Sequence, residues 1–88
     1  MMIHRKGDWL SERVADELIM MSVAKGLYVG MSEVGACIWE FLEQPRSLDD
    51  ICAHVAMEFE ITPAACRPDV EKFLRELESK DAVSFDPS

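Results

Sequence analysis

Three cysteines and two histidines are the side chains of this 88-residue chain whose types could support metal or thiol chemistry. Cys37, Cys52 and Cys66 are widely spaced and form no C-x-x-C pair, and neither histidine lies at a finger-like spacing from them. His54 is two residues from Cys52 on an expected helix, so the two side chains point in different directions and make a poor nucleophile and base. The sequence therefore predicts three reduced thiols packed as small hydrophobic residues, with no metal and no cofactor.

Other patterns that carry chemistry do not occur. The chain has no glycine-rich phosphate loop, no G-x-S-x-G, no H-E-x-x-H and no calcium-loop spacing. These absences do not exclude catalysis but leave it unsupported, and we expect a protein that is not an enzyme. A small thiol or metal enzyme stays open as an alternative, which thiol titration of the folded protein and metal analysis would test.

Size and charge restrict the partners further. The formal net charge of -8 and the pI near 4.6 disfavour nucleic acid and anionic membrane surfaces, because binding to polyphosphate draws on basic residues. Residues 69 to 81 carry five acidic and three basic side chains, which counts against a winged-helix transcription regulator. The N-terminus lacks the apolar core of a secretory signal and no stretch is long enough to span a membrane, so the expected compartment is the cytoplasm.

The elements that must position any site follow an α+β order within a single expected domain, 1–88, whose core covers about 9–83. Weak alternation at 8–14, an apolar run at 17–23 and a further run at 27–31 predict three short antiparallel strands. Residues 24–26 predict the second hairpin loop, in which Gly26 takes the left-handed conformation. Residues 82–85 are expected to close the core as a short extended tail.

Three helices follow the strands, and each start has a capping signal. Ser32 caps a helix over 33–42, Ser47 with Asp50 forms an S-x-x-D capping box, and Thr62 precedes a proline suited to the first helical position. Pro68 would remove a backbone hydrogen bond from that last helix, so we expect a single turn at 63–66 and a main helix from about 68. A kinked single helix is the alternative.

Two of these elements have more apolar surface than their positions explain. The strand at 27–31 contains no charge or proline, although an exposed sheet edge is usually blunted by such residues. The last helix has an apolar stripe of Val70, Phe73, Leu74 and Leu77. A groove between such an edge and such a helix can accept an extended peptide as an added strand. The stripe could equally be ordinary core, and pairing of two copies through the edge is also left open.

The order and spacing of four motifs resemble the PqqD-like family, whose members are also called RiPP recognition elements. These motifs are G-x-Y at Gly26, E-V-G-A-x-I-W-x-x-L from Glu33, S-L-D-D-I from Ser47 and D-V-x-x-F-L-x-x-L from Asp69. The resemblance implies a winged-helix-like fold with a three-stranded antiparallel sheet followed by three helices. It also implies binding of the leader segment of a ribosomally made precursor peptide as a further strand.

Carried onto matching positions, the resemblance implies a peptide-binding site on the third strand and the third helix. Its residues are Leu27, Tyr28, Val29, Asp69, Val70, Phe73, Glu76 and Leu77. The short free-standing chain is most similar to the leader-binding proteins of lasso-peptide clusters, which implies a leader peptidase and a macrolactam synthetase as partners. A chaperone that presents a precursor to a radical SAM or other modifying enzyme is the alternative within the family.

Overall fold

A computed structural model describes residues 1–86 of the chain. The central feature is a meander of three antiparallel strands, β2 (Leu10–Val14), β3 (Glu17–Ser22) and β4 (Leu27–Met31), with β3 in the middle. The three predicted strands are therefore confirmed. The loop before β4 closes as expected, because Gly26 takes a φ of 66° and its amide donates to the Ser22 carbonyl at 2.9 Å.

Two helices begin at the serines that the sequence marked as caps. The Ser32 hydroxyl accepts from the Gly35 amide at 3.2 Å and starts α1 (Glu33–Phe41), while the Ser47 hydroxyl accepts from the Asp50 amide at 3.0 Å and starts α2 (Leu48–Glu58). α1 follows β4 with a single residue between them. It packs against both β3 and β4, so the helix and the strand edge have a fixed relation.

The third helix, α3 (Pro63–Ser79), is capped by Thr62 and runs through Pro68 without a break. The prediction of a separate turn at 63–66 was wrong. Cys66 before Pro68 and Val70 and Leu74 after it are all buried on one face of α3, and the helix packs against α2. This continuous packing outweighs the roughly 3 kcal/mol that an interior proline costs a helix, and Pro68 itself stays exposed.

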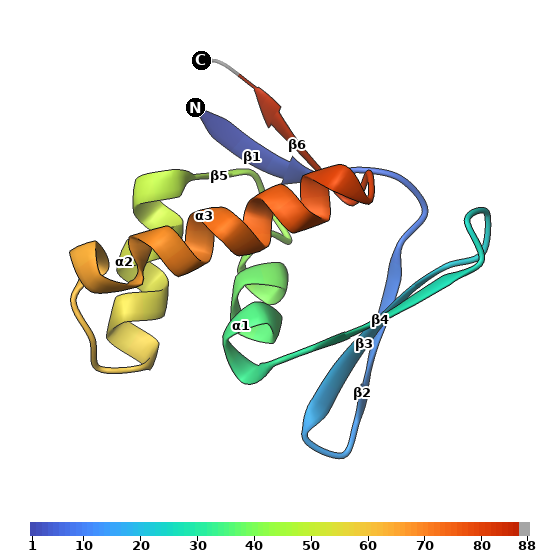
Figure 1. Cartoon of the computed structure of the whole chain (residues 1–88), viewed down its shortest axis with the longest axis horizontal. Helices are drawn as coiled ribbons and strands as arrows, with labels where there is room; N and C mark the ends of the chain where they lie inside the picture. Colours follow the sequence, from blue (N-terminus) through green and yellow to red (C-terminus); the bar gives the residue numbers. More distant parts are fainter. Residues whose placement is uncertain (87–88) are drawn as a thin grey trace.

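A second antiparallel sheet was not foreseen. It consists of β5 (Arg46–Ser47), β1 (Met2–Arg5) and β6 (Val83–Asp86), with β1 in the middle. The predicted extended tail is thus confirmed as β6, and Ile3 of β1, which precedes the expected core range of about 9–83, is fully buried. Figure 1 shows β1 and β6 side by side at one end of the molecule and the β2–β4 meander projecting at the other.

The core lies among the three helices and the inner faces of the sheets. Its largest buried side chains include Trp39, Ile38 and Leu74. Trp39 lies off the main apolar stripe of α1 and packs toward β1, where the Arg5 guanidinium stands 4.3 Å from the centre of its ring. Among residues 1–86, no helix is long and apolar enough to cross a membrane.

Candidate functional site

β4 is an edge strand. Its register with β3 pairs Val29 with Met20 and Tyr28 with Met21, and its other side has no strand partner within residues 1–86. Tyr28 is 77% exposed and Leu27 41% exposed, large values for apolar and aromatic side chains. β4 therefore offers both unpaired backbone groups and apolar side chains to a strand that adds beside it.

Successive side chains of β4 point to opposite faces of the sheet. Met31 is buried, Val29 packs against the core, and Leu27 shares their face, which is the face toward the helices. Tyr28 lies on the outer face together with its cross-strand neighbour Met21. Of the three predicted strand residues, Leu27 and Val29 thus face the helices, and Tyr28 could contact an added strand from the opposite face of the sheet.

The five predicted residues of α3 divide into three groups. Val70 and Leu77 are each 1% exposed and belong to the core, so they support the site from within and have no surface for a peptide to contact. Phe73 is half-buried against the core, and Asp69 and Glu76 are exposed. In the described part of the chain neither of these two carboxylates forms an ion pair, which leaves them free to meet basic groups of a ligand.

Gly35 of α1 allows Phe73 to lie close to β4. A Cβ atom built on Gly35 would stand 2.9 Å from Phe73 Cε1 and 3.5 Å from the Cβ atom of Met31, the last residue of β4. A glycine is needed here because any side chain would meet the aromatic ring. The aromatic ring of Phe73 on α3, the first turn of α1 and the end of β4 are therefore close together.

Gly35→Ala should destabilise the fold by about 1 kcal/mol, because the cost of overpacking against Phe73 exceeds the gain of roughly 1 kcal/mol from helix propensity. Urea unfolding measures this change. Gly30→Ala is the matched control, since nothing lies within 4 Å of a Cβ atom there and its expected effect is within about 0.5 kcal/mol. Equal stability of Gly35→Ala and the unmodified protein would show that Phe73 does not press on α1.

Two carboxylates fix the hairpin that ends in β4. Asp8 accepts hydrogen bonds from the buried Ser22 hydroxyl at 2.7 Å and from the Ala24 amide at 3.1 Å, and these bonds lower the pKa of Asp8. Asp81, just after α3, pairs with Lys6 at 3.1 Å and with Lys25 of the hairpin loop at 3.5 Å, and both lysines lower the pKa of Asp81, Lys6 more strongly. The hairpin is thus connected to the end of α3.

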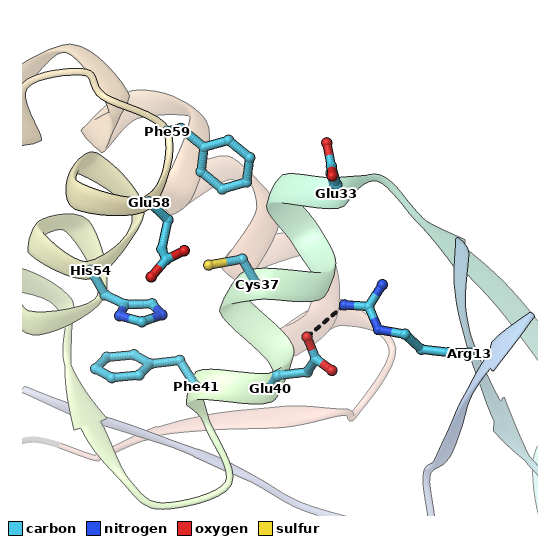
Figure 2. A pocket seen from close by; sticks show the side chains of 8 residues that line it. All are labelled: Arg13, Glu33, Cys37, Glu40, Phe41, His54, Glu58 and Phe59. Carbon is cyan, nitrogen blue, oxygen red and sulfur yellow. Dashed lines mark hydrogen bonds and ion pairs between the residues drawn. The ribbon is translucent and has the colours of Figure 1, made fainter. Parts of the chain in front are cut away.

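A pocket of about 520 Å³ lies elsewhere, between β2, α1 and α2, and sequence reasoning missed it. Figure 2 shows its lining, which consists of Arg13, Glu33, Cys37, Glu40, Phe41, His54, Glu58 and Phe59. No local pattern connects these residues, because they come from three elements that only the tertiary fold brings together. The i, i+4 and i+7 spacing of Glu33, Cys37 and Glu40 was the one available signal, since it places them on one side of α1.

Cys37 and His54 meet in this pocket, a pairing that differs from the Cys52 and His54 pair considered from the sequence. Burial, together with the charges of Glu58 and Glu40, raises the pKa of the Cys37 thiol, which reduces the thiolate available at neutral pH. His54 stacks on Phe41, with ring centres 4.0 Å apart, and does not hydrogen-bond to the thiol in the described part of the chain. This geometry gives no support to a cysteine nucleophile.

Cys52 and Cys66 are buried and free, as predicted for packed thiols. The Cys66 thiol donates to the Cys52 carbonyl at 3.6 Å, and burial raises the pKa of Cys52. Within residues 1–86, no group of three or more His, Cys, Asp or Glu side chains could hold a metal ion.

The strands, the helices and the free β4 edge define an α+β domain of the winged-helix-like class. The family described as "Coenzyme PQQ synthesis protein D (PqqD)" matches residues 17–83, and the chain belongs to this family. A solved structure, "TbiB1 in Complex with the TbiA(beta) Leader Peptide", is similar over 97% of this chain and 99% of that one, with a TM-score of 0.83 and 24% identity. That similarity confirms the fold. No curated protein sequence matches the chain significantly.

Proposed function

We propose that this protein binds the leader segment of a ribosomally synthesised precursor peptide as an additional strand on β4. The observation that carries the proposal is the free, uncharged edge of β4 with Phe73 of α3 beside its end. Backbone groups of β4 would supply affinity, and the inward-facing Leu27 and Val29 with Phe73 would select apolar leader side chains. Membership of the PqqD family and the leader complex formed by the similar TbiB1 structure support this reading.

The role of the protein in this proposal is delivery without catalysis. A bound leader holds the rest of the precursor near any enzyme that also contacts this protein, which raises the effective concentration of the precursor at that enzyme. The motif resemblance to the leader-binding proteins of lasso-peptide clusters supports a lasso-type pathway, so we propose a leader peptidase and a macrolactam synthetase as the enzymes served. The exposed Asp69 and Glu76 would meet basic leader residues at the rim of the site.

A fluorescence-anisotropy titration tests the proposal. The probe is the labelled leader half of a short precursor encoded beside the gene, and saturable binding at micromolar Kd or tighter is expected. Unlabelled leader should compete for the site, and the core half of the same precursor should not. A folded protein that binds neither half of such a precursor would contradict the proposed function.

A further inference from the structure

The pocket of Figure 2 has the size and composition of a binding site, although the β4 site does not use it. Its volume of about 520 Å³ lies within the range of roughly 300–1,000 Å³ usual for pockets that hold small ligands or side chains. Phe41, Phe59 and Cys37 supply apolar walls. Three carboxylates surround these walls, so the pocket combines an aromatic interior with negative charge.

The negative charge of the pocket is incompletely neutralised. Arg13 of β2 pairs with Glu40 at 2.7 Å, whereas Glu33 and Glu58 form no ion pair with any residue of the described range. The pocket therefore has one internal arginine for three carboxylates. A further cation of similar shape would complete the charge balance.

The aromatic rings of this fold already bind guanidinium groups. Arg46 stands 4.1 Å from the centre of the Phe41 ring, and the His54 ring stacks on the same ring, so both faces of Phe41 are covered. Within residues 1–86 the Phe59 ring has no such partner and is the aromatic wall open to a ligand. Arg75 lies over Phe85 at a similar distance of 4.3 Å. A planar guanidinium combines stacking on rings with paired hydrogen bonds to carboxylates, which a lysine ammonium does less well.

The pocket and the proposed leader site lie on opposite sides of α1. At 100° per residue, Glu33, Cys37 and Glu40 group on one side of the helix, and Gly35, which contacts Phe73, lies almost directly across from them. β2, which contributes Arg13, is also the edge of the sheet opposite β4. A molecule in the pocket would therefore leave β4 accessible.

Three exposed apolar residues are sequence neighbours of residues that line the pocket. Val34 follows Glu33 on α1 and is 36% exposed, Met57 precedes Glu58 on α2 and is 71% exposed, and Ile61 after Phe59 is 46% exposed. Apolar contacts around a desolvated arginine anchor are typical of protein interfaces. The surroundings of the pocket thus fit a protein surface better than a free small cation.

We infer that this pocket is a docking site for a second protein, which inserts an arginine side chain beside Glu33 and Glu58 and against the ring of Phe59. The inference goes beyond the proposed function and does not depend on it, because the pocket is formed in the free chain. The charge imbalance and the three exposed apolar side chains together define the partner as a protein with an arginine set among apolar residues. Such a partner could bind at the same time as a strand on β4.

Amide chemical-shift mapping of the ¹⁵N-labelled protein tests the site with N-acetyl-L-arginine amide as the probe. Saturable shifts in the millimolar range, centred on Cys37, Phe41, His54 and Glu58, are expected. N-acetyl-L-citrulline amide has nearly the same shape without the charge and should bind at least about tenfold more weakly. N-acetyl-L-lysine amide should lie between the two.

Three variants make the test specific to the pocket. Glu58→Gln should weaken arginine-amide binding several-fold, and Arg13→Gln should strengthen it because it frees Glu40 from its ion pair. Asp50→Asn removes the same charge from an exposed position near the other end of α2 and should leave binding unchanged. Dispersed spectra of all three variants establish that each is folded.

The inference is overturned by any of three results. These are citrulline amide binding as well as arginine amide, an unchanged affinity in Glu58→Gln, or shifts spread over the acidic surface without a centre in the pocket. All measurements use the free protein, so the result of the leader titration has no bearing on them.

Discussion

Phe73→Ala should weaken leader binding by about tenfold to a hundredfold, which corresponds to roughly 1.4–2.8 kcal/mol. Phe73 is the apolar side chain of α3 that meets α1 at Gly35 and lies beside the end of β4. Removal of the ring would delete the apolar contact that we propose between α3 and a peptide strand on β4. The measurement is the anisotropy titration with labelled leader, repeated on the variant.

Two comparisons separate this loss from a general loss of folding. Tyr28→Ala should also weaken binding, but less, since its side chain lies on the outer face of the sheet. Met57→Ala removes an exposed apolar side chain from α2 and should leave leader affinity unchanged. If Phe73→Ala binds like the unmodified protein while circular dichroism shows it folded, the ring is not part of the leader site.

Ile38→Ala should lower the free energy of unfolding by about 2–5 kcal/mol. Ile38 is fully buried at the centre of α1, and its truncation leaves a cavity among core side chains. Because small domains have only about 5–15 kcal/mol of stability in total, this change should lower Tm by on the order of 10 °C or more. Urea and thermal unfolding both measure it.

The matched control is Val34→Ala on the same helix, where the side chain is 36% exposed and the expected loss is below about 1 kcal/mol. At temperatures where Ile38→Ala remains folded, its leader affinity should equal that of the unmodified protein. A selective loss of leader affinity in folded Ile38→Ala would mean that the leader site extends into the core of α1.

Local chemistry explains which parts of the fold could be predicted. The caps at Ser32, Ser47 and Thr62 each act within three residues, so sequence spacing was enough to place the helix starts. The second sheet pairs Met2 with Asp86, a contact between distant parts of the chain that leaves no local periodicity. Pro68 was misread because the packing of α3 against α2, invisible in the sequence, decides whether the helix continues.

The sequence predicted the candidate site about as completely as it predicted the fold. A meander of three strands leaves its last strand at an edge, and the order of strands shows β4 there, although its lack of charge is unusual for an edge. Spacing alone could not show which residues of the α3 stripe face the core and which reach the surface, since Val70, Phe73 and Leu77 share one side of the helix. Burial separates them, with Val70 and Leu77 in the core and Phe73 half-exposed. The pocket beside α1 is formed by three elements, so its one sequence signal was the spacing that places Glu33, Cys37 and Glu40 on the same side of α1.

The pairing of β1 with β6 has a consequence for protein architecture. Met2 lies opposite Asp86, so the beginning and the end of the described chain are separated by about one interstrand spacing, roughly 5 Å. A fold with adjacent ends can be inserted into a surface loop of a larger enzyme, or circularly permuted with a short linker, without stretching either sheet. β4 and the pocket beside α1 lie away from that junction, whereas α3 packs against β6 through Arg75 and Phe85, so an insertion there should leave the free strand edge and the pocket accessible.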